Sequence, residues 1–282
     1  MHRLPGFEFQ RAHFPLRGGK TSGWLFACGW GAGLLALAIP ATARLAADET
    51  PAATVRERKI VRKSLPKEVR SIALEYTIEQ LTPEGGTRAI DPATHTFQVG
   101  DSFLVRISPE DDLYVYVFNE GPDGERICLM PTEGEEPQLV KSGTKVDLPD
   151  DGGFFTFEPP AGEEKLVVVA LPEPTKDLRL LAAAVFRGQG GGVPSVKAEA
   201  KTEADAALKS MRDRAEQGTR SRGPVRKVVE RMSQPLPPDS RTTHIEPPTA
   251  GETASYGIAI AGPQAGPPEL ILDIPLRSSV GK

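Results

Sequence analysis

The sequence has few residues of the kinds that usually carry catalysis or cross-links. Cysteine occurs twice and histidine four times in 282 residues. Beyond residue 43 only Cys128 remains, so an intramolecular disulfide is excluded. Cys128 lies in the apolar run 127–130, which predicts a buried and unreactive thiol. Aromatic residues make up only 6% of the chain, so we expect an ordered core in part of it.

Familiar catalytic and metal-binding patterns are also missing. His95 and His244 have no second ligand at a metal-site spacing, and we expect both at the surface. There is no G-x-S-x-G, H-E-x-x-H or phosphate-loop pattern. We therefore expect no enzyme, no cofactor and no metal, and we assign no catalytic residue. A hydrolase with dispersed carboxylates is kept as the second alternative.

One acidic loop resembles a calcium-binding loop in part. Asn119, Asp123 and Gly124 match its positions one, five and six, but Gly121 has no oxygen ligand at position three. Met130 occupies the position of the bidentate acid. A solvated turn is the preferred interpretation.

The first 43 residues have the form of an export signal. A basic start precedes an apolar run from Trp24 to Ile39, and Ala41 to Ala43 offer a small-residue cleavage site. We predict a periplasmic or secreted protein cleaved after Ala43, with a retained anchor as the alternative. The net charge is −4, and removing this basic segment makes it more negative, which argues against nucleic-acid binding.

Glycine and proline are abundant, with 28 and 27 residues, about a fifth of the chain against roughly 12% in average usage. They separate short runs with strand character. Seven such runs at a spacing of about ten residues predict an all-β fold, an immunoglobulin-like or similar β-sandwich, or a barrel. The runs are 72–78, 103–107, 113–118, 127–130, 145–148, 154–157 and 166–171.

The run 113–118 is apolar on both faces. Leu113, Val115 and Val117 alternate with Tyr114, Tyr116 and Phe118, because successive side chains of a strand point to opposite faces. A strand without a polar face belongs inside a sheet. The three aromatic residues are therefore predicted core, with a glycan-stacking surface on Tyr114, Tyr116 and Phe118 as the alternative.

The region after the strands is predicted to hold one inserted helix. The run 178–186 fits either a strand or a helix. Thr202 and Asp205 form a capping-box pattern that predicts a helix over 203–217. Its narrow apolar stripe could lie on the protein's own surface or dock a partner through Leu208 and Met211. Arg220, Arg222 and Arg226 could add a basic docking patch, with a solvated segment as the other interpretation.

The C-terminal runs 256–261 and 270–275 read as two strands that return to the main sheet, because two strands alone are marginal in water. Five segments result: a signal peptide (1–43), a disordered leader (44–68), a β-sandwich core (69–187), an insertion with the helix and a disordered Pro-rich stretch (188–250), and returning strands (251–282).

The order of features from Thr96 to Leu171 resembles an uncharacterised bacterial domain family, a domain of unknown function (type four-three-eight-four). The matching positions are Phe97, Gly100-Asp101, 114–119, Asp123-Gly124, 129–131, Gly143, Leu148-Pro149, 160–163 and 166–170. The resemblance implies a small β-rich domain, often exported or attached to other modules, with no established catalytic residues. The leading prediction is an exported, non-enzymatic β-sandwich that binds another protein or an envelope component.

Overall fold

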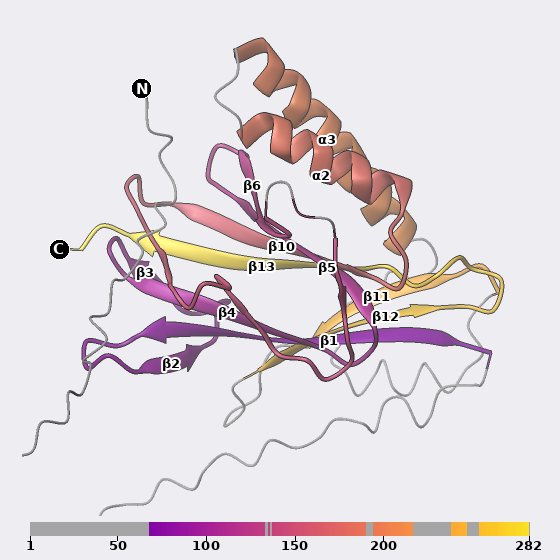
Figure 1. Ribbon diagram of the computed structural model, residues 1–282, viewed down its shortest axis with the longest axis horizontal. Coiled ribbons are helices and arrows are strands. Elements are labelled where there is room, and N and C mark those ends of the chain that lie inside the picture. The colour runs from indigo at the N-terminus through magenta and orange to yellow at the C-terminus, as the bar shows by residue number, and fades with distance from the viewer. Residues whose placement is uncertain are drawn as a thin grey trace, which may run out of the picture.

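The computed structural model describes residues 68–132, 135, 137–189, 194–216, 238–246 and 254–281. The predicted signal, nearly all of the predicted leader, and Arg220, Arg222 and Arg226 lie outside these residues. The described chain forms two packed sheets, with two helices lying across the outer face of one of them (Figure 1). The all-β prediction is confirmed, and the architecture is a sandwich with a third, helical layer.

One sheet has seven strands and the other has six. The larger sheet has the order β11-β12-β1-β4-β8, with β2 beside β1 and β9 beside β4. Its strands are β1 (Arg70–Leu81), β2 (Thr87–Ile90), β4 (Ser102–Pro109), β8 (Val146–Leu148), β9 (Phe155–Thr156), β11 (Arg241–Glu246) and β12 (Ser255–Ala261). The smaller sheet has the order β3-β13-β10-β5-β6, with β7 beside β5. Its strands are β3 (Phe97–Gln98), β5 (Leu113–Glu120), β6 (Arg126–Met130), β7 (Leu139–Val140), β10 (Glu163–Leu171) and β13 (Leu270–Ser279).

Strand β5 is buried on both faces, as its alternation predicts. Leu113, Val115 and Val117 point into the core between the two sheets. Tyr116 and Phe118 point the other way, into a second core beneath the helices, and their exposed fractions are 1% and 0%. Neighbouring β10 is likewise divided between the two cores. These central strands therefore hold the three layers together.

Two helices cover the outer face of the smaller sheet, where one was predicted. The ambiguous run 178–186 lies within α2 (Lys176–Gln189), and its start is capped by Thr175, whose Oγ1 accepts from the Leu178 N–H at 3.2 Å. Its buried residues follow helical spacing and face the sheet. The structure therefore shows that the run 178–186 is helical, with its apolar side chains buried on one face.

The second helix, α3 (Pro194–Glu216), begins earlier than predicted. The predicted cap Thr202 lies inside the helix, where its hydroxyl donates to the Ala198 carbonyl at 2.9 Å. Pro194 starts the helix instead, because proline suits the first helical position. Asp205 does not complete a capping box and instead binds Arg126.

The two C-terminal strands lie inside the sheets, one in each. β12 pairs with β1, and β13 pairs with β10 and β3. β11, which falls in the predicted Pro-rich insertion, forms the edge beside β12. The short strands β2 and β7 were also not predicted from the sequence.

Candidate functional site

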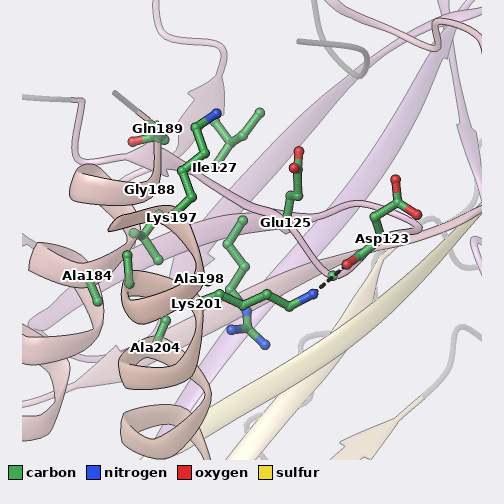
Figure 2. A pocket seen from close by; sticks show the side chains of 14 residues that line it. Asp123, Glu125, Ile127, Ala184, Gly188, Gln189, Lys197, Ala198, Lys201 and Ala204 are labelled. Atoms are coloured by element: carbon green, nitrogen blue, oxygen red, sulfur yellow. Dashed lines mark hydrogen bonds between the residues drawn. The ribbon is translucent and has the colours of Figure 1, made fainter. Parts of the chain in front are cut away.

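A pocket of about 450 Å³ lies between the β5–β6 turn and the junction end of the two helices. The hairpin contributes residues 123–127, α2 contributes Ala184, Val185, Gly188 and Gln189, and α3 contributes Lys197, Ala198, Ala200, Lys201 and Ala204. Its helical walls carry mostly small apolar side chains, and charged groups lie at the opening (Figure 2). This size and lining are typical of binding pockets.

The turn is shaped by a glycine that also allows a close approach. Gly124 has a φ of 70°, in the left-handed region, and its N–H donates to the Gly121 carbonyl at 2.9 Å. A Cβ at Gly124 would lie 2.9 Å from the Lys201 Nζ. Lys201 donates to the Asp123 carbonyl at 2.6 Å, shown as the dashed line in Figure 2. Turn and helix are thus joined at the rim.

Arg126 forms the second link between hairpin and helix. Its guanidinium contacts Glu120 and the α3 residue Asp205, each at 2.6 Å. Lys165 also contacts Glu120 at 2.6 Å. Burial opposes ionisation of Glu120, but the hydrogen bonds and charges of Lys165 and Arg126 outweigh it, so the pKa of this carboxyl is lowered. The ion cluster therefore stays charged at neutral pH and holds α3 against β6.

A charged cluster fixes the opposite end of the helix pair. Arg214 of α3 contacts Asp177 at the start of α2, and its Nε lies 3.1 Å from the Glu269 Oε1. Arg241 of β11 reaches the same oxygen at 2.7 Å. The hydrogen bond from Arg214 keeps the pKa of Asp177 low. With both ends attached, the helices present a fixed wall to the pocket.

A second hollow, of about 400 Å³, lies on the outer face of the larger sheet, over β1, β2 and β4. Arg106 crosses it, with Nη1 2.5 Å from the Glu79 Oε1 and Nε 2.7 Å from the Asp147 Oδ1. The Arg106 hydrogen bond lowers the pKa of Asp147. Charged and polar side chains make up nearly all of this lining, whereas the hairpin–helix pocket also has walls of small apolar side chains, so the hairpin–helix pocket is the better candidate site.

The aromatic residues considered for glycan stacking do not form an open surface. Tyr116 and Phe118 lie beneath the helices, and Tyr114 is partly buried against the same core. Stacking on a sugar requires an accessible ring face. The glycan alternative is therefore corrected: these aromatic residues are core.

The residues considered for partner docking on the helix are also core. Leu208 and Met211 are 1% and 0% exposed, against the smaller sheet. The interpretation of a helix lying on the protein's own surface describes α3 correctly. Docking through Leu208 and Met211 is excluded in this structure, because the sheet already covers them.

The partial calcium loop does not assemble a ligand set. Asn119 is buried on β5 and donates from Nδ2 to the Glu164 Oε2 at 3.0 Å. In the described part of the chain, no three His, Cys, Asp or Glu side chains are grouped as a metal site. His95 stacks edge-on against Phe97, and burial, with help from the Arg88 charge, lowers its pKa. The side chain of His244 lies outside the described part of the structure.

The α3 wall of the pocket was not predicted from the sequence, because the predicted helix began too late. Lys197, Ala198 and Lys201 precede the predicted start at 203. Pro194, followed by strong helix formers directly after a glycine-rich break, was the available signal. Nothing in the sequence indicated that the turn at 121–125 would lie beside this helix.

The fold and the pocket define a β-sandwich protein with a helix-covered sheet. Residues 96–174 match the model of a family described as Domain of unknown function (DUF4384), which confirms the resemblance in the sequence. The matched part runs from β3 to β10 and contributes strands to both sheets. No curated protein and no solved structure matches the chain. Within the described residues, no helix is long and apolar enough to cross a membrane.

Proposed function

We propose that the protein is an exported, non-enzymatic binding module, which docks another protein or an envelope component in the hairpin–helix pocket. The observation that carries this proposal is the pocket itself, with its walls of small side chains and its charged opening. Export rests on the signal-like segment 1–43.

The groups around the pocket support binding over catalysis. Lys201 and Arg126 are held by structural contacts to the turn and to Glu120. Cys128 lies in the helix-side core, where burial raises the pKa of its thiol to about 12. A thiol with such a pKa is protonated at neutral pH and is a poor nucleophile. The chemistry here favours recognition of a surface or segment.

The test compares two substitutions on the same helix. Ala198 lines the pocket and is exposed, so Ala198→Trp would fill it without disturbing the core. Ala206 is exposed on α3 outside the pocket lining, so Ala206→Trp is the matched control. The tagged protein is purified from its own cell envelope in all three forms, after equal melting temperatures have been verified.

We expect a defined set of chains to co-purify with the wild type and with the Ala206→Trp control. Ala198→Trp should reduce their recovery at least tenfold. Equal recovery with both tryptophan variants, or no specific recovery at all, would contradict the pocket as the binding site.

Export is tested separately. The mature protein should be recovered outside the cytoplasm of a bacterial host, with Arg44 at its N-terminus by mass spectrometry. A cytoplasmic protein that keeps residues 1–43 would refute this part of the proposal.

A further inference from the structure

The pocket lies beside a strand edge that no described strand occupies. β6 is the last strand of the smaller sheet and pairs with β5 on one side only. An edge strand offers backbone N–H and C=O groups to an incoming chain. In β6 this edge coincides with the pocket, because Arg126 and Ile127 line it.

The pairing register identifies which backbone groups point outward. Glu120 is opposite Arg126, and the Gly121 N–H donates to the Glu125 carbonyl at 2.9 Å. In an antiparallel ladder this bond makes Glu120 and Arg126 a non-hydrogen-bonded pair. The N–H and C=O of Arg126 therefore point away from β5, toward the open edge.

The charged side chains with which α3 lines the pocket at that edge, Lys197 and Lys201, are basic. The Arg126 side chain lies on the same face of β6 as Cys128, two residues on, which faces the helix-side core. From α3, Lys197 and Lys201 extend toward the hairpin (Figure 2). A residue added opposite Arg126 would project its side chain toward Lys197 and Lys201, because the Arg126 guanidinium is already paired with Glu120 and Asp205. The small side chains of Ala198 and Ala204 leave room for it.

We propose that the pocket takes an extended peptide segment of a partner protein, which pairs with the backbone of Arg126 as an added strand and places an acidic side chain facing α3. This inference rests on the proposed function and names the chemistry of its partner. Main-chain hydrogen bonds supply affinity in such pairing, and alternate side chains supply specificity. The basic helix wall selects a carboxylate by charge complementarity.

The backbone bond is tested with two substitutions at one position. Arg126→Ala and Arg126→Pro both remove the guanidinium, but only proline removes the outward N–H. Proline at such an edge position keeps the ladder to β5, because the lost N–H is not part of it. The probe is a phage-displayed library of random heptapeptides, selected on the immobilised wild-type chain, and the enriched peptides are resynthesised.

We expect enriched peptides that carry Asp or Glu and that bind the proline variant at least tenfold more weakly than the alanine variant. In the wild type, hydrogen exchange of the Arg126 amide should slow when the peptide is added. This measurement does not depend on whether a variant folds. Equal binding by the two variants, or unchanged exchange of this amide, would overturn strand pairing. If Ala198→Trp still blocked envelope partners, the proposed function would stand without it.

The acidic preference is tested on α3. Lys197→Glu should weaken binding of the enriched peptides at least tenfold. Lys209→Glu, at an exposed position outside the pocket, should change their binding less than twofold. Enrichment of peptides without acidic residues, equal effects of the two substitutions, or no enrichment at all would refute the assignment of a carboxylate-bearing strand.

Discussion

Glu164→Gln should stabilise the protein at neutral and alkaline pH. Glu164 is 7% exposed and receives one hydrogen bond, from Asn119 Nδ2 at 3.0 Å. Burial raises the pKa of this carboxyl, against the Asn119 bond that favours its charged form. The Asn119 Oδ1 is buried and has no hydrogen-bond partner. A glutamine can accept from Nδ2 and also donate to Oδ1, so the Asn119 oxygen gains the hydrogen bond that it lacks.

The size of the effect follows from the unpaired groups. A buried polar atom without a partner costs about 1–3 kcal/mol, and the substitution also removes the burial of a charge. We expect a gain of about 1–3 kcal/mol in the free energy of unfolding at pH 8. Because the folded-state pKa of Glu164 lies above its unfolded value, the wild type loses stability as the pH rises through the folded-state pKa. The gain should therefore fade as the pH falls, and disappear when the carboxyl is protonated in both states.

The assay is urea unfolding followed by circular dichroism at a series of pH values, with the slope and midpoint fitted together. Glu163→Gln is the matched control, since it removes the same charge from a neighbouring side chain that is 84% exposed. The control should change stability by less than about 0.5 kcal/mol at every pH. A destabilised Glu164→Gln at pH 8, or a gain that does not vary with pH, would refute the reasoning.

Three further results are expected. Phe118→Ala should cost about 3–5 kcal/mol in unfolding experiments, because this fully buried ring fills the core beneath the helices; a cost below about 1 kcal/mol would contradict that packing. The Cys128 thiol, with its pKa raised to about 12, should be unreactive toward a disulfide reagent at pH 8 until urea unfolds the chain; rapid native labelling would contradict its burial. Gly124→Ala should destabilise more than Gly143→Ala in thermal melts, because both have positive φ but the new Cβ at Gly124 would also displace the Lys201 ammonium from the Asp123 carbonyl; equal shifts would argue against this link.

The sandwich could be predicted from the sequence because local patterns carry most of it. Alternation at 113–118 defined both faces of β5, and turn residues bounded most of the other strands. The helices were harder to predict from the sequence. Alanine-rich runs such as 178–186 have similar composition in buried strands and buried helices, so only the packing in three dimensions separates them.

The candidate site could not be predicted, for a different reason. It depends on a turn at residues 121–125 lying against a helix that begins at Pro194, far along the chain. No residue on either segment has an unusual chemistry by itself. The aromatic row drew attention in the sequence because aromatic side chains serve both cores and surfaces, and the helix pair over β5 decided between the two.

The position of β12 and β13 has a consequence for biogenesis. β13 lies between β3 and β10, and β12 lies between β11 and β1, so neither sheet is continuous before residues 255–279 have left the ribosome (Figure 1). Until then β1 is paired with β4 and β2, and β10 with β5, but the edge of each that faces β12 or β13 has no partner strand. The two sheets are therefore completed by the last two strands of the described chain, so a chain that lacks 255–279 would lose the strands that join β11 to β1 and β3 to β10.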